Sequence, residues 1–205
     1  MSFAEVEAWV RANLPPPPAR VLEVGAGDGS LARTLRASGY DVTAIDPKSD
    51  TADVEPLALV DLQEPAQPFD AGVAVVSLHH VEPLAESCGR LAELVEPGGV
   101  LAIDELDIRR YDERATSWWL HQRRAAGFED DHTPESILEG MRGHIHALDD
   151  VLAALAPHFS LGEPVRGPYL HRWHLPPGLR ENEERLIGEG ALPATGARVV
   201  GIRRS

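Results

Sequence analysis

Hydrophobic and polar positions along the chain follow a pattern that predicts strands separated by helices. Short, mostly apolar runs with the length of buried strands occupy residues 20–24, 41–45, 71–77 and 99–105. Helical spacing of apolar residues fills the intervals at 30–38 and 83–95. The run at 71–77 is apolar on both faces, as expected for a strand with helices on both sides. The pattern predicts an α/β fold with a doubly wound, mostly parallel sheet.

The first 18 residues predict a helix followed by an extended connector. Ser2 and Glu5 have the spacing of a capping box, and apolar residues follow on one helical face. The prolines at 15–18 end this helix and favour a polyproline conformation. We expect the helix to cover a neighbouring cleft.

The second half of the chain departs from the strand-helix alternation. Residues 106–156 predict a helical insertion over the site, with helix starts at Asp112 and Thr133. Strand candidates at 159–175 and 196–204 flank a charged helical piece at 178–190. These strands would complete the sheet with one antiparallel member, and residues 1–205 would form a single domain.

The amino-acid composition limits the classes of binding partner and the cellular compartment that we expect. The formal net charge of −14 repels phosphate backbones and anionic lipids. No run reaches the roughly twenty apolar residues of a membrane span, and the acidic first residues are unlike an export signal. Cys88 is the only cysteine, which excludes an internal disulfide and a thiolate metal cluster. We expect a cytoplasmic monomer or homodimer that binds a small molecule and neither nucleic acid nor membrane.

The stretch "VLEVGAGDGSLA" at 21–32 predicts a ligand-binding turn between a strand and a helix. Gly25, Gly27 and Gly29 let the backbone approach a ligand closely, and the helix amides beginning near Ser30 favour an anionic group. The spacing departs from the dinucleotide fingerprint, because Ser30 stands where the third glycine of that motif belongs. Asp28 is the expected cap of the following helix.

Acidic residues near this turn indicate what the ligand contains. Glu23 lies in a buried strand, where a ligand ammonium group would compensate its desolvation. Asp46 ends the strand at 41–45, where its two oxygens suit the hydroxyls of a ribose. Asp61 and Leu62 are candidates for the edge of an adenine. The implied ligand has an amino acid end and an adenosine end.

Four ordered stretches within residues 20–105, "VLEVGAGDGSLA", "VTAID", "FDAGVAVVSLHHVEPL" and "LAELVEPGGVLAIDELD", resemble the motifs of class I S-adenosylmethionine-dependent methyltransferases of the small-molecule branch. The resemblance implies a seven-stranded sheet whose fifth strand, at 99–105, precedes the helical insertion. It implies S-adenosylmethionine as cofactor, with Asp46 on the ribose and Asp61 and Leu62 on the adenine. It also implies that the methionine part is held by Glu23, Gly25, Ala26, Gly27 and Gly29, and the sulfonium side by Ser77, Leu78 and His79.

A methyltransferase must position a nucleophile behind the methyl group, and an oxygen or nitrogen nucleophile can need a base. His79 and His80, just after the strand at 71–77, are the candidates. The alternative is that one of them bonds the turn and caps the helix near Pro83. For Asp104 and Glu105, pairing with Arg109 or Arg110 is the alternative to catalysis.

Substrate-binding candidates lie in the helical insertion: Tyr111, Trp118, Trp119 and His146. A place in the hydrophobic core is the alternative for the aromatic residues. The pairs His144 with His146 and His171 with His174 suggest a metal, but no carboxylate partners have ligand spacing, so we expect none.

Two other functions remain open from the sequence. One is a non-catalytic domain that binds S-adenosylmethionine or a partner, and the other is an NAD(P)-dependent oxidoreductase. Protein and nucleic acid substrates are disfavoured, because Ser77, Leu78, His79 and His80 replace an asparagine-proline-proline-tyrosine motif.

Overall fold

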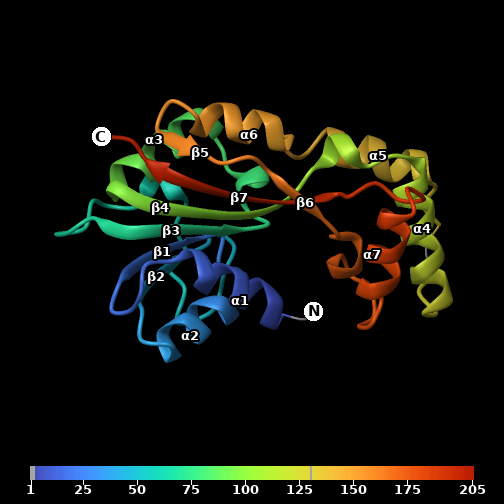
Figure 1. Cartoon of the computed structure of the whole chain (residues 1–205), viewed down its shortest axis with the longest axis horizontal. Helices are drawn as coiled ribbons and strands as arrows, with labels where there is room; N and C mark the ends of the chain where they lie inside the picture. The colour runs from blue at the N-terminus through green and yellow to red at the C-terminus, as the bar shows by residue number, and fades with distance from the viewer. Residues whose placement is uncertain (1–2, 130) are drawn as a thin grey trace.

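A computed structural model of the protein describes residues 3–129 and 131–205. In this part of the chain a sheet of seven strands has the order β2-β1-β3-β4-β7-β5, with β6 also paired to β7 (Figure 1). The parallel strands are β1 (Arg20–Val24), β2 (Asp41–Ile45), β3 (Phe69–Val75) and β4 (Val95–Leu106). Strand β7 (Gly196–Arg203) runs antiparallel to β4. The predicted α/β sheet with one antiparallel member is confirmed.

Helices cover both faces of the sheet (Figure 1). α1 (Phe3–Asn13) and α2 (Ser30–Ala37) lie on one face, and α3 (Leu84–Leu94) and α6 (Leu148–Leu155) lie on the other. A separate hydrophobic cluster fills the space on each side. Because the helices cover both faces, a ligand can enter at the edge formed by the carboxyl ends of the parallel strands.

The N-terminal helix contributes to the core. Val6 and Val10 are buried together with Val21, Leu31 and Leu35 beneath α1 and α2. No residue of α1 lines the cavity beside the glycine turn; Glu5 instead lines a separate cleft. The predicted capping box includes Ser2, which lies outside the described residues.

The predicted insertion at 106–156 divides into two parts. α4 (Glu113–Ala125) and α5 (Pro134–Arg142) stand at one end of the sheet with α7 (Arg180–Gly188), whereas α6 packs on the sheet (Figure 1). The predicted helix starts are present, since the side chains of Asp112 and Thr133 accept from backbone amides of α4 and α5. The helices at the end of the sheet enclose a third cluster of buried residues.

The predicted strand at 159–175 is wrong as one element. It consists of β5 (Phe159–Leu161), β6 (Val165–Gly167) and the short 3-10 helix η4 (Leu170–Arg172). Pro164 and Pro168 interrupt it, because proline cannot donate a hydrogen bond to a neighbouring strand. Among the described helices, none is long and apolar enough to cross a membrane.

Candidate active site

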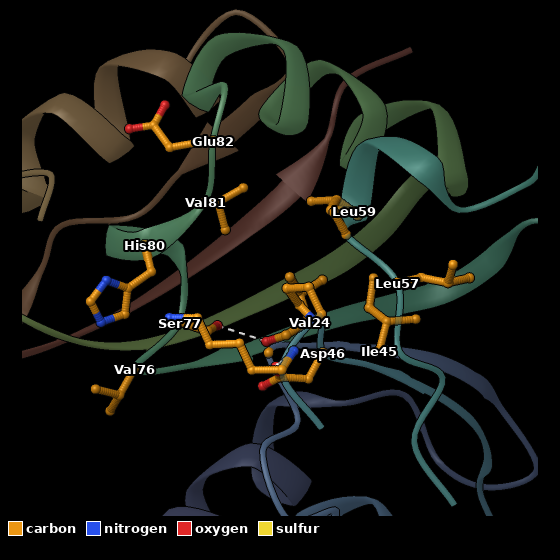
Figure 2. Close-up of a pocket in the computed structure, with 14 residues that line it drawn as sticks. Val24, Ile45, Asp46, Leu57, Leu59, Val76, Ser77, His80, Val81 and Glu82 are labelled. Atoms are coloured by element: carbon orange, nitrogen blue, oxygen red, sulfur yellow. Dashed lines mark hydrogen bonds between the residues drawn. The ribbon is translucent and has the colours of Figure 1, made fainter. Parts of the chain in front are cut away.

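A cavity of about 310 Å³ lies at the carboxyl ends of β1, β2 and β3. It is lined by residues 24–25, 45–48, 57–59, 76–77 and 80–82. In Figure 2, Val76, Ser77 and His80 lie on one side, and Ile45, Leu57 and Leu59 lie on the other. The cavity therefore brings together the glycine turn, the end of β2 and the turn after β3.

Gly25 fits closely against the turn after β3. It has φ 71°, and a Cβ at this position would lie 2.3 Å from the Cβ of Ser77. The Ser77 hydroxyl donates to the Val24 carbonyl at 2.6 Å, an interaction drawn in Figure 2. The amides of Gly25 and Ala26 both donate to the Ile45 carbonyl, at 2.8 and 3.0 Å. Only glycine meets both the conformation and the space at this position.

Asp46 joins the glycine turn to the end of β2. Its Oδ2 accepts the Gly27 amide at 2.9 Å, and its Oδ1 accepts the Lys48 amide at 2.8 Å. The Ser49 hydroxyl also donates to the Gly27 carbonyl at 2.7 Å. Each carboxylate oxygen retains acceptor capacity, and the side chain lines the cavity. This geometry is compatible with the predicted ribose contact.

Glu23 is buried on the side of β1 that faces α2. Its side chain is 3% exposed, and Oε2 has no hydrogen-bond partner among the described residues. Desolvation by burial raises the pKa of this carboxyl to about 8, although the nearby Arg36 charge acts in the opposite direction. An orphaned carboxylate oxygen next to the glycine turn fits a ligand that brings an ammonium group.

Asp28 is not the N-cap of α2 as predicted, because the N-cap is Gly29, which makes no side-chain capping bond, and Asp28 precedes it. Its Oδ1 accepts the Ser30 amide at 3.0 Å. Hydrogen bonds from Ser30 hold the pKa of Asp28 below its ordinary value. The side chain therefore fixes the start of α2.

Glu105, at the end of β4, fixes the turn after β3. It is 1% exposed, and Oε1 accepts the amides of Ser77 and Leu78 at 2.8 and 2.7 Å. Its Oε2 lies 2.7 Å from Nδ1 of His79, which is also buried. One carboxylate thus sets both the backbone of the turn and the orientation of the His79 ring.

The alternative pairing predicted for Asp104 and Glu105 is wrong. Arg109 pairs with Asp149 and Asp150, at 2.7 and 3.0 Å. Arg110 donates to the Ala194 carbonyl at 2.7 Å. The fold instead places Asp104 between Arg172 and Arg198, in contacts that link β4 to η4 and β7.

Val76 has a left-handed backbone at the edge of the cavity. Its φ is 53°, an unfavourable value for a β-branched residue. Its amide donates to the Asp104 carbonyl at 2.8 Å, which ties the strained residue to β4. The strain redirects the chain from β3 so that the Ser77 side chain meets the glycine turn. This left-handed residue also explains why β3 ends at Val75 and not at residue 77 as predicted.

His80 lines the cavity, and His79 lies behind it. The two ring centroids are 4.1 Å apart. Burial, followed by the effect of neighbouring His79, lowers the pKa of His80, so this ring is neutral at pH 7. Neither histidine caps α3, whose N-terminus lacks a side-chain capping bond among the described residues.

His146 approaches the same turn from the segment before α6. Its amide donates to the His79 carbonyl at 2.9 Å, and its Nε2 lies 2.9 Å from Glu82. Tyr111 and Trp119 are buried in the cluster among α4, α5 and η4, and Trp118 packs against this cluster. Trp119 also stacks on Trp173 and donates to its carbonyl at 2.7 Å. Of the four predicted substrate residues, the structure brings His146 alone to the turn after β3.

The predicted adenine residues lie outside the cavity lining. Asp61 ends the 3-10 helix η1 (Leu59–Asp61) and is exposed. Leu62 is buried in the core, and its carbonyl accepts from Arg90 at 2.7 Å. The wall at this point consists of Leu57, Ala58 and Leu59. An apolar wall of this kind suits a flat aromatic base.

One histidine of each pair considered for a metal has a protein partner for its ring. His144 Nδ1 bonds the Gly140 carbonyl at 2.7 Å, and His171 Nδ1 lies 2.7 Å from Glu183. Within the described residues, no group of three or more histidine, cysteine or acidic side chains is arranged to hold a metal ion.

Residues 3–139 match a family model described as a methyltransferase domain. The match covers more than half of the chain. The chain therefore belongs to the class I S-adenosylmethionine-dependent methyltransferases. S-adenosylmethionine is the cofactor of this family, and Gly25 and the orphaned Glu23 oxygen fit it.

Two curated relatives and one solved structure illustrate the similarity. A malonyl-(acyl-carrier protein) O-methyltransferase of Enterobacter lignolyticus (strain SCF1) is 26% identical over 166 residues, covering 73% of this chain and 64% of that protein. A ubiquinone biosynthesis O-methyltransferase of Xylella fastidiosa (strain 9a5c) is 33% identical over 115 residues, covering 48% and 46%. The chain thus spans less than two thirds of both relatives. The S-adenosylmethionine-dependent methyltransferase from Mesorhizobium loti has the same fold, with a TM-score of 0.62, 18% identity and 96% of each chain covered.

Proposed function

We propose that the protein methylates an oxygen atom of a small molecule by in-line displacement. The observation that supports this most is the cavity, which joins a glycine turn, an acidic residue at the end of β2 and a neutral histidine. The two relatives described above are both O-methyltransferases by name. An oxygen acceptor is also the kind that benefits from a nearby base.

Several residues in and near the cavity would each bind a different part of the cofactor. Asp46 would accept the ribose hydroxyls, and Glu23, which is buried outside the cavity lining, would pair with the ammonium group. The apolar wall of Leu57 and Leu59 would contact the adenine. When bound, S-adenosylmethionine supplies an electrophilic methyl group on its sulfonium.

His80 is the proposed proton acceptor. It lines the cavity, and its lowered pKa keeps the ring unprotonated at pH 7. His79 is a positioning residue in this mechanism, because Glu105 holds its ring and the turn on which both histidines lie. His80 would take the proton of an acceptor hydroxyl bound in the cavity, and the methyl group would pass from the sulfonium to the acceptor oxygen with S-adenosylhomocysteine as the leaving group.

Substitution of His80 tests the mechanism. We expect His80→Gln to lower kcat by about a hundredfold or more, the size of general-base effects, and to leave the affinity for S-adenosylhomocysteine unchanged. Production of S-adenosylhomocysteine measures kcat, and calorimetry measures the affinity. His121→Gln is the matched control, because His121 is exposed on α4 away from the cavity. Wild-type kcat in His80→Gln would remove the proton-acceptor role.

A further inference from the structure

A second cavity, of about 190 Å³, lies where η4, β6, β7 and the start of α7 meet α1. Asp104 lines it, whereas the next residue of β4, Glu105, holds the turn after β3. The Asp104 carbonyl accepts the Val76 amide at 2.8 Å, and Val76 lines the first cavity. The two cavities therefore adjoin the same point, at the ends of β3 and β4.

Positive charge gathers at this second cavity in a chain of formal net charge −14. Its lining contains four arginines, each from a different element: Arg166, Arg172, Arg180 and Arg198. The acidic side chains of the lining are Asp104 and Glu5. Guanidinium groups thus outnumber carboxylates on the wall itself.

The arginines share the carboxylates that face them. Asp104 accepts from Arg172 at 2.5 Å and from Arg198 at 2.8 Å. Glu5 pairs with Arg180 and lies 3.3 Å from Arg198. Further acidic partners lie outside the lining, with Asp107 bonded to Arg166 and Glu184 bonded to Arg180. Because the lining carboxylates are shared, donor capacity remains for an added anion.

Arg172 has one donor atom that its carboxylate partner leaves unsatisfied. Its side chain is 10% exposed, and its Nε has no hydrogen-bond partner among the described residues. A buried donor without an acceptor is unfavourable, so a rearrangement that brings an oxyanion to this guanidinium would be favoured.

The wall that presents Arg172 is rigid. Glu183 is fully buried and accepts the amides of Tyr169, Leu170 and His171 at 2.8 to 2.9 Å. It also bonds Nδ1 of His171 at 2.7 Å. The contacts of Glu183 with successive amides and a histidine ring are the same kind that Glu105 makes with the turn at 77–79. Pre-ordered donors bind an anion with little loss of conformational entropy.

We propose that the second cavity is the acceptor site, and that it takes a small molecule bearing an oxyanion, either a carboxylate or a phosphate. The proposal rests on the proposed methyl transfer. Arg172, Arg180 and Arg198 hold the anionic group, and the remainder of the acceptor extends past Val76 toward the methyl group.

Calorimetry with two simple anions tests the site. The full chain, saturated with S-adenosylhomocysteine, is titrated separately with succinate and inorganic phosphate at low ionic strength. We expect one of them to bind, and Arg180→Gln to weaken that binding by about tenfold, as for loss of a charge-assisted contact. Arg185→Gln, on the same helix but outside the lining, should bind like wild type. Equal weakening in both variants, or binding of neither anion to wild type, would overturn the proposal.

Glu5→Gln distinguishes an anion site from a packing effect. Removal of this carboxylate frees Arg180 and Arg198, so the anion should bind more tightly. A substitution that merely loosened the contact between α1 and the cavity would weaken binding instead, which would contradict the proposal.

Failure of this proposal is distinguishable from failure of the proposed function. If S-adenosylhomocysteine binds and neither anion does, the acceptor site is wrong and the methyltransferase assignment stands. The test can be extended by measuring turnover of pairs of acceptor molecules in which one member is a carboxylic acid and the other is its amide. Arg180→Gln should lower turnover of the acid and leave turnover of the amide unchanged, and equal turnover of the acid by Arg180→Gln and wild type would also overturn the proposal.

Discussion

At the scale of single residues, Gly25 has no space for a side chain. An added Cβ would lie 2.3 Å from that of Ser77, and φ is 71°. We expect Gly25→Ala to lower the free energy of unfolding by about 3 kcal/mol, from steric overlap and left-handed strain together. It should also abolish S-adenosylhomocysteine binding. Denaturant unfolding and calorimetry measure the two effects.

Gly27→Ala is the matched control for this prediction. Gly27 also has a positive φ, 55°, but nothing lies within 4 Å of an added Cβ. Its loss of stability should be limited to conformational strain, about 1–2 kcal/mol. Equal losses in the two variants would show that the contact with Ser77 does not set the turn.

Asp46 offers a second test of a single residue. We expect Asp46→Ala to weaken S-adenosylhomocysteine binding by about thirtyfold, or 2 kcal/mol, since hydrogen bonds to a charged group are lost. Asp50→Ala, a nearby exposed carboxylate outside the cavity lining, should bind like wild type. Calorimetry provides both affinities, and an unchanged value for Asp46→Ala would refute the ribose contact.

Glu23 should make the stability of the ligand-free protein depend on pH. Its pKa is about 8 in the fold, against 4.5 for an ordinary carboxyl. The folded state therefore binds more protons between these values, and the stabilising contribution is complete below pH 4.5 and lost as pH rises through 8. The slope within this window approaches about 1.4 kcal/mol per pH unit.

Denaturant unfolding at pH 5, 6, 7 and 8 measures this dependence. Glu23→Gln should flatten the curve, because its side chain does not titrate. Parallel curves for the two proteins would assign the pH dependence to other groups.

Among the candidate residues, those that lie in local sequence motifs could be predicted from the sequence. The glycines, Asp46 and Ser77 lie in short patterns with a physical meaning, and all but Gly27 and Gly29 line the cavity. The role of Glu105 could not be predicted from the sequence, because its partners at 77–79 lie far away along the chain, in the turn after β3. The left-handed Val76 likewise depends on its contact with β4.

At the scale of elements, the turn at 77–79 depends on Glu105. We expect Glu105→Gln to lower the melting temperature and to reduce kcat, because an amide cannot accept all the donors that now converge on the carboxylate. Its kcat–pH profile should also shift to lower pH, because the charge of Glu105, which acts to raise the pKa of His80, is removed. Glu86→Gln, on the exposed side of α3, is the control. A lower melting temperature with an unchanged pH profile would leave Glu105 a purely structural role.

The parallel strands were predictable, but the segment after α6 was not. Apolar runs define β1, β2 and β3 closely because both faces of these strands are buried. The segment at 159–175 has apolar residues without a regular period, and its 3-10 turn forms because Glu183 binds three successive amides. This interaction joins distant parts of the chain, so local patterns did not indicate it.

At the scale of the whole molecule, an acidic surface surrounds an arginine-lined cavity. The net charge should repel long polyanions, whereas the local arginines suit a small anion. One backbone hydrogen bond, from Val76 to Asp104, links the lining of the glycine-turn cavity to that of the arginine-lined cavity, and the proposed acceptor site requires this proximity.

The most direct measurement is calorimetric titration of the purified chain with S-adenosylhomocysteine, alongside NADH at the same concentration. The glycine spacing, Asp46 and Glu23 predict micromolar binding of S-adenosylhomocysteine and no binding of NADH. Binding of NADH alone would contradict the assignment of the cavity to a methyl donor, and binding of neither would indicate a domain that has lost cofactor binding.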